Sequence, residues 1–147
     1  MKKVYLITLI FLISTKFIFA KELLLKHHMT FEEKVIFLND GSTFNNFNAL
    51  GVWEDNNGNY GPANCQGVRM IGKDKNLISL NIICQHDGIK DEKFWTLSKR
   101  DTDKDGGIGK VKVIDSTKFF NSYTGYSCTY AVSFEKNIYI AKSKCKQ

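Results

Sequence analysis

Apolar and polar residues alternate with a period of two along much of the chain. From Tyr126 to Phe134 every second side chain is Tyr, Cys, Tyr, Val or Phe, and Ser, Thr or Ala lies between them. This is the period of a β-strand with one buried face. Strands are predicted for seven further segments: 35–38, 49–53, 65–71, 77–84, 93–98, 108–114 and 138–142. Between 77 and 84 we expect Ile78, Leu80, Ile82 and Cys84 on one face.

Turn residues separate the predicted strands. Asn, Asp and Gly, which tolerate positive φ, gather between them, for example at 39–41, 55–58 and 105–107. Short connections favour an all-β antiparallel meander of about eight strands, which buries its apolar face by closing into a barrel or by packing as a sandwich. We favour a single closed or nearly closed barrel, because closure removes exposed strand edges. Leu23 to Glu33 is expected to form a short helix or an arm, and Ser116 to Ser122 an irregular turn.

Residues 1–20 have the features of a secretory signal peptide. Lys2 and Lys3 precede an apolar run that ends at Thr15, and Ala20 stands before the charged Lys21. Ile18 lies where signal peptidase prefers a small residue, which leaves an uncleaved anchor as the alternative. We expect residues 1–20 to be the signal peptide, and residues 21–147 to form one domain that is periplasmic or secreted. Membrane contact is then expected only through the signal peptide.

The charge of the chain argues against nucleic acid as a partner. Three of the 21 Lys and Arg lie in residues 1–20, which contain no acidic residue, so the remaining chain carries a net charge of +3. A nucleic-acid-binding surface needs clustered Lys and Arg, whereas these residues are scattered here. No cofactor is expected either, and the sequence does not indicate an oligomeric state.

Four cysteines lie in the expected exported part: Cys65, Cys84, Cys128 and Cys145. An even number in an exported protein indicates disulfides, and no C-x-x-C spacing favours a metal or redox motif. We favour the pairs Cys65–Cys84 and Cys128–Cys145, because each pair spans enough residues for two strands and a turn. A long-range bridge between the two halves of the chain is the alternative.

Two groups of residues suggest metal binding. Asp101, Asp103 and Asp105 alternate before Gly106, as in the first half of an EF-hand loop, but Lys112 replaces the glutamate that completes such a site. The segment is therefore either a weak calcium site or a solvated turn. His27 and His28 are a second candidate, although neighbouring residues of a strand point to opposite faces. His86 lies in a predicted turn, where it could bind zinc only if Cys84 were reduced.

Aromatic side chains make ligand binding the leading function. Tyr126, Tyr130 and Phe134 share one face of a strand, and an eight-stranded barrel is just wide enough to be filled by side chains or to hold one small ligand. A small apolar ligand would contact these three residues together with Trp53, Phe94 and Trp95. The alternative is that these rings fill the core.

Two segments resemble known families. Gly51-Val52-Trp53 is similar to the G-x-W motif of the calycins, the lipocalin and avidin group, in which the Trp closes one end of a barrel. Residues 105–125 resemble a glycine-rich pattern of small secreted bacterial proteins of unknown function and, more distantly, of allene-oxide-cyclase-like and dirigent-like barrels. Both resemblances imply a barrel fold and assign no catalytic residues.

No catalytic motif is found: the chain lacks a Gly-x-Ser-x-Gly elbow, and its acidic pairs are sequence neighbours whose side chains diverge. We therefore expect an exported, non-enzymatic module that binds a small ligand or has a structural role. The alternatives are a cyclase- or isomerase-like barrel enzyme, and an envelope module for protein interaction or inhibition.

Overall fold

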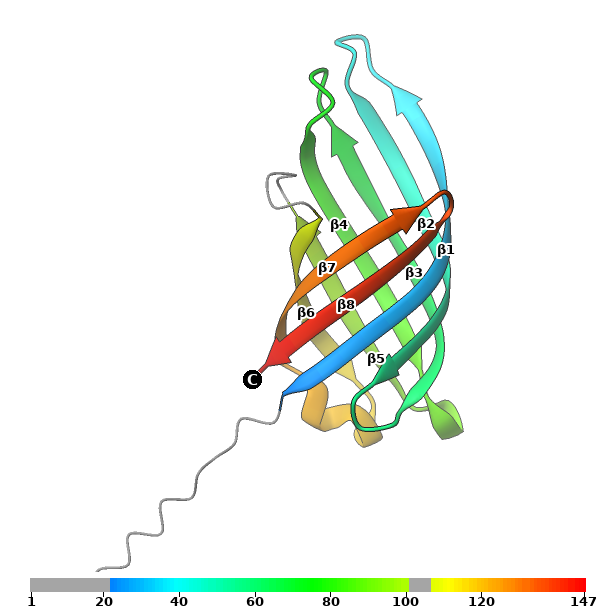
Figure 1. Cartoon of the computed structure of the whole chain (residues 1–147), viewed down its shortest axis with the longest axis vertical. Helices are drawn as coiled ribbons and strands as arrows, with labels where there is room; N and C mark the ends of the chain where they lie inside the picture. The colour runs from blue at the N-terminus through cyan, green and yellow to red at the C-terminus, as the bar shows by residue number, and fades with distance from the viewer. Residues whose placement is uncertain (1–21, 101–106) are drawn as a thin grey trace, which may run out of the picture.

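Eight antiparallel strands form a closed barrel. The computed structural model describes residues 22–100 and 107–147. Each strand pairs with the next along the chain, and β1 pairs with β8 to close the barrel (Figure 1). The strands are β1 (Leu23–Phe37), β2 (Thr43–Asp55), β3 (Tyr60–Ile71), β4 (Leu77–Asp87), β5 (Lys93–Arg100), β6 (Ile108–Ser116), β7 (Ser127–Glu135) and β8 (Ile138–Lys146). The predicted all-β barrel is therefore confirmed, and each predicted strand lies within or largely overlaps one of these eight.

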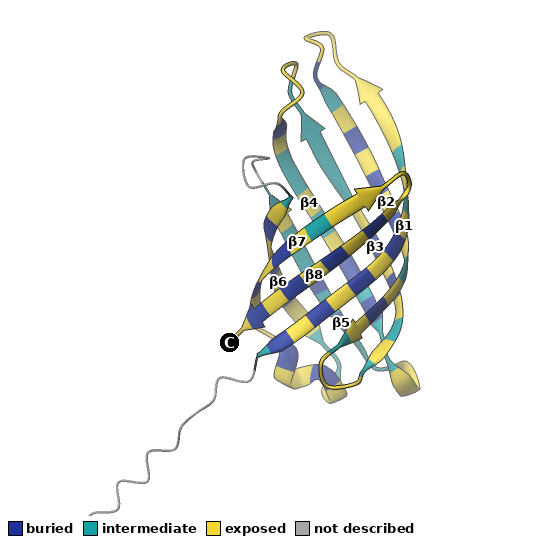
Figure 2. Ribbon diagram, viewed as in Figure 1, coloured by how far each residue is buried: buried dark blue, intermediate teal, exposed yellow. Residues whose placement is uncertain are grey.

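Buried and exposed residues alternate along the strands, most clearly in β8 and in the first part of β1 (Figure 2), because successive side chains point into the barrel and out to solvent. In β8, for example, Tyr139, Ala141, Ser143 and Cys145 are buried, and the residues between them are exposed. Short turns with positive φ join the strands. One of them is the turn between β7 and β8, in which Lys136 has a φ of 56°.

The segment from Leu23 to Glu33 is neither a helix nor an arm. It is the first part of β1, which pairs with β2 along one edge and with β8 along the other. Its alternation of buried and exposed residues explains this outcome, because every second side chain from Leu23 to Phe31 faces the barrel interior. The predicted irregular turn contains a short 3-10 helix, η2 (Lys118–Tyr123).

Ile78 lies on the outer face of β4, contrary to the prediction. It is 48% exposed, whereas Leu77 is 7% exposed and Cys84 faces the interior. An irregularity in the β3–β4 pairing explains this. Ile71 pairs with Leu77, but the preceding residue of β3, Met70, pairs with Ser79, so Ile78 is an extra residue in β4. One extra residue in a strand reverses which side chains face inward beyond that point.

The two ends of the barrel differ. β1 pairs with β8 only as far as Thr30, but it continues beside β2 to Phe37. The β1–β2 and β3–β4 hairpins therefore extend past β7 and β8 at the upper end of Figure 1. At the other end lie η2 and a second short 3-10 helix, η1 (Ile89–Asp91). Within the described ranges, no helix has the length and apolar character needed to cross a bilayer.

Both expected disulfides are present. Cys65–Cys84 joins β3 to β4, and Cys128–Cys145 joins β7 to β8. In each pair the two cysteines are direct register partners, so each bridge links the strands of one hairpin. All four side chains are buried in the barrel. Two such bridges indicate folding in an oxidising environment.

Candidate functional site

A cluster of aromatic rings closes one end of the barrel. Trp53, Phe94 and Phe120 are each at most 1% exposed, and the Trp53 and Phe94 rings meet edge to face with centroids 4.8 Å apart. The Trp53 Nε1–H donates to the backbone carbonyl of Asp87 at 2.9 Å, which satisfies the one polar atom of its side chain. This end therefore contains a packed core.

Polar contacts fix η2 across this closed end. The Tyr123 hydroxyl donates to Asp55 Oδ2 at 2.5 Å and accepts hydrogen bonds from the side chains of Asn57 and Asn59. Burial and then the Asp55 carboxylate raise the pKa of Tyr123 to about 12. The Glu92 carboxylate accepts from the Thr117 hydroxyl and from the backbone N–H of Phe119. These contacts hold the 3-10 helix against the strand ends.

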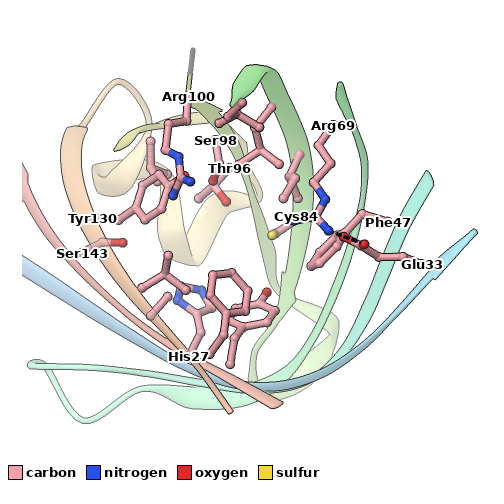
Figure 3. A pocket seen from close by; sticks show the side chains of 18 residues that line it. His27, Glu33, Phe47, Arg69, Cys84, Thr96, Ser98, Arg100, Tyr130 and Ser143 are labelled. Atoms are coloured by element: carbon pink, nitrogen blue, oxygen red, sulfur yellow. Dashed lines mark hydrogen bonds and ion pairs between the residues drawn. The ribbon is translucent and has the colours of Figure 1, made fainter. Parts of the chain in front are cut away.

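The other half of the barrel contains a cavity of about 110 Å³ (Figure 3). All eight strands contribute side chains to its wall, most of which is apolar. Residues of this wall include Phe47, Leu80, Ile82, Val111, Val132 and Phe134. A pocket of this size and character accommodates a single small molecule, of the order of one or two fused rings.

An ion pair lies at the edge of the cavity. The Arg69 guanidinium on β3 contacts the Glu33 carboxylate on β1 at 2.5 Å, and the Asn45 amide of β2 donates to the same carboxylate at 3.1 Å (Figure 3). Glu33 is only 13% exposed, so this pair is better shielded from solvent than the surface pair Lys26–Glu54. The contacts connect three neighbouring strands at the point where β1 extends beyond β8.

Arg100 and Tyr130 lie on the opposite side of the cavity from this ion pair (Figure 3). Burial raises the pKa of Tyr130, and the hydrogen bond and charge of Arg100 oppose that shift. A Cβ on Gly109 would lie 2.3 Å from Tyr130 Cε1, so the absence of a side chain at Gly109 allows the Tyr130 ring to occupy this position.

Two buried histidines meet below the cavity. The Nε2 atoms of His27 on β1 and His86 on β4 are 2.8 Å apart, and His27 also lines the cavity. The His86 ring stacks on Phe94 with centroids 4.2 Å apart, which connects the pair to the aromatic cluster. Burial, followed by the charge of His28, lowers the pKa of His27 to about 4, and burial also lowers the pKa of His86.

Several polar atoms in or beside the cavity have no protein partner among the described residues. None of the described residues hydrogen-bonds the hydroxyls of Thr96 and Ser143, although these residues are 2% and 5% exposed. Near the ion pair, Arg69 Nε and Asn45 Oδ1 are likewise buried without a partner. The hydroxyls of Thr96 and Ser143 are therefore the polar groups of this set that a bound molecule can engage.

The structure separates the six aromatic residues that were expected to bind a ligand. Tyr130 and Phe134 line the cavity. Trp53 and Phe94 belong to the closed end, and Tyr126 is buried in the same core. Trp95 lies on the outer face of β5, where its Nε1–H donates to Gln85 Oε1 at 3.3 Å.

The candidate metal ligands are not brought together. Asp101, Asp103 and Asp105 lie outside the described residues, so the calcium site stays a prediction. His28 points away from His27, as expected for neighbours in a strand. Within residues 22–100 and 107–147, no group of three His, Cys, Asp or Glu side chains is placed to hold a metal ion.

The sequence pattern did not indicate the His27–His86 pair or the Glu33–Arg69 ion pair. A signal for the first was present, because His27 follows Leu23 and Leu25 at the same spacing that places both inside. His86 similarly follows Cys84 by two residues, and it belongs to β4 rather than to the turn that was predicted there. No sequence pattern indicated that the two histidines meet, since 59 residues separate them.

Comparisons with known proteins leave the function to be inferred from this geometry. No protein-family model, curated protein or solved structure matches the chain.

Proposed function

We propose that this protein is a non-enzymatic binding module that acts in the periplasm or outside the cell and holds a small, mainly apolar molecule inside its barrel. The cavity carries this proposal. It is closed on one side by packed aromatic rings, and its mostly apolar wall also carries polar groups, among them His27, Arg100 and Ser143. Such a composition is typical of pockets that bind small molecules, in which apolar contacts give affinity and polar groups give orientation.

The calycin resemblance agrees with this proposal. Trp53 of the Gly51-Val52-Trp53 segment lies in the aromatic cluster that closes one end, which is the role that the resemblance implies. The segment belongs to β2 in this chain, whereas the calycin motif opens the first strand of the barrel. The likeness is therefore limited to the position of the Trp side chain at one end of a barrel.

An enzyme of the cyclase or isomerase type is the second candidate, and His27 is the observation in its favour. It is an ionisable residue in the cavity with a perturbed pKa. A general base works best when its pKa is near the working pH, however, and a pKa of about 4 makes His27 a weak base at neutral pH. The low pKa of His27 therefore favours ligand binding over catalysis.

A module for protein interaction is the third candidate. The β1–β2 hairpin exposes apolar side chains at its tip, and Phe37 is 80% exposed. The cavity favours the binding of a small molecule, because an interaction module needs no hollow interior.

Filling the cavity tests the proposed function. Ala141 lines the cavity from β8, and Ala131 is an exposed alanine on neighbouring β7. Ala141→Leu narrows the site, whereas Ala131→Leu adds the same atoms outside and serves as the matched control. We expect native mass spectrometry of protein purified from its own source to show a bound small molecule in wild type and Ala131→Leu, with reduced occupancy in Ala141→Leu. Equal occupancy in all three proteins, or no retained molecule in any of them, contradicts the proposal.

A further inference from the structure

The hydrogen bond between His27 and His86 sets the orientation of both rings. Each side chain is buried, at 8% and 0% exposed, and the two Nε2 atoms are 2.8 Å apart. At that distance one nitrogen donates and the other accepts. The assignment of the proton follows from the second contact of His86.

The second contact of His86 is with a backbone carbonyl. His86 Nδ1 lies 3.3 Å from the Phe94 oxygen, and a carbonyl oxygen only accepts. His86 therefore carries its proton on Nδ1, and its Nε2 is an acceptor. The donor in the pair is then His27 Nε2–H, which leaves the lone pair of neutral His27 on Nδ1.

This lone pair of His27 is available to a ligand. Among the residues that the structure describes, none donates a hydrogen bond to His27 Nδ1. The ring lines the cavity and points into it (Figure 3). Burial keeps the ring uncharged at neutral pH by lowering its pKa to about 4, so Nδ1 stays an acceptor. His27 Nδ1 is not among the fully buried side-chain atoms of the described residues, so a molecule in the cavity can reach it. A ligand that excludes water from this acceptor without supplying a donor leaves it unsatisfied at a cost in free energy, whereas a ligand N–H or O–H satisfies it.

We propose that the ligand is a small neutral molecule with one N–H or O–H group on an otherwise apolar frame, and that this group donates to His27 Nδ1. The inference rests on the proposed function and adds the chemical class of the ligand. A pure hydrocarbon leaves the acceptor unsatisfied. A carboxylate has no proton to donate, and its oxygens would face the lone pair of the ring. The cavity of about 110 Å³ limits the frame to roughly one or two fused rings.

Indole and benzofuran are matched probes for this proposal. They have nearly the same shape, and benzofuran has an oxygen in place of the indole N–H. We expect wild type to bind indole at least about tenfold more tightly than benzofuran in calorimetric titrations, because one buried hydrogen bond distinguishes them. His27→Leu should abolish this preference while retaining benzofuran binding. His28→Leu, which changes the neighbouring side chain on the outer face, should retain the preference.

A measurement on the unaltered protein keeps the test independent of whether His27→Leu folds. In ¹⁵N NMR spectra of the imidazole rings, we expect His27 protonated on Nε2 and His86 on Nδ1, and the His27 Nδ1 resonance should shift when indole is added. A proton on His27 Nδ1, or equal affinity for the two probes, overturns the inference while binding inside the barrel still supports the proposed function. No binding of either probe, and no shift in the cavity, contradicts both.

Discussion

Acidification should destabilise the fold through the two buried histidines. The folded protein keeps His27 and His86 uncharged, whereas an unfolded histidine has a pKa near 6.5. The unfolded chain therefore binds more protons than the folded chain as the pH falls from about 6.5 to about 4. The free energy of unfolding decreases over that window. The exposed carboxylates with lowered pKa values remain mostly charged down to about pH 5: Asp40, Glu54, Asp74 and Glu92.

The size of the effect follows from the pKa of His27. With a pKa of about 4 in the folded chain and 6.5 in the unfolded chain, His27 alone costs about 2 kcal/mol of stability between about pH 7 and about pH 5. Burial lowers the pKa of His86 in the same direction, so the loss for the pair should be larger than the loss for His27 alone. A loss of this size is a large part of the stability of a typical domain, about 5–15 kcal/mol.

Urea denaturation followed by far-ultraviolet circular dichroism measures this loss at the two pH values. Glutamine does not titrate but keeps an N–H donor, so His27→Gln should remove the contribution of His27, about 2 kcal/mol, from the pH dependence. His28→Gln changes an exposed side chain and removes only the smaller of the two causes of the lowered His27 pKa, so it should reduce the pH dependence much less than His27→Gln. A wild-type stability that is the same at both pH values, or an equal effect of the two substitutions, refutes this reasoning.

Two further predictions concern the closed end of the barrel and the disulfides. Trp53→Ala should cost about 3–5 kcal/mol in the same denaturation assay, because it opens a hole in the aromatic cluster and removes the hydrogen bond to Asp87, whereas Trp95→Ala on the outer face should cost less. Equal losses would show that Trp53 does not close this end. Replacing both Cys128 and Cys145 by Ala should lower stability by about 3 kcal/mol, since the bridge closes a loop with a sequence separation of 17 residues. An unchanged denaturation midpoint would contradict a stabilising role for the bridge.

Local sequence patterns predicted the strands because they depend on neighbouring residues. The alternation between Tyr126 and Phe134 reports which side chains share a face, and the Asn, Asp and Gly turns report where the chain reverses. Both disulfide pairs followed from the same hairpins, since each bridge joins strands that are consecutive in the chain. The position of Ile78 was not predictable in this way. One extra residue in the β3–β4 pairing reverses which side chains of β4 face inward, and the alternation of apolar and polar residues gives no sign of it.

The contents of the cavity depend on contacts across the barrel. Alternation indicates that Trp53 and Tyr130 point inward, but their depth along the barrel depends on strand stagger, which places Trp53 in the closed end and Tyr130 in the cavity.

By itself, then, the sequence determined the strands and their turns and favoured a barrel with two disulfide-linked hairpins, because alternation and turn residues are local, whereas closure of the sheet required the tertiary structure. Only the tertiary structure decided that His27 meets His86 and that Glu33 meets Arg69. These partners lie on different strands, 59 and 36 residues apart in the chain, and they come together only when the sheet closes on itself. The side chains that give the cavity its chemistry are therefore set by barrel closure.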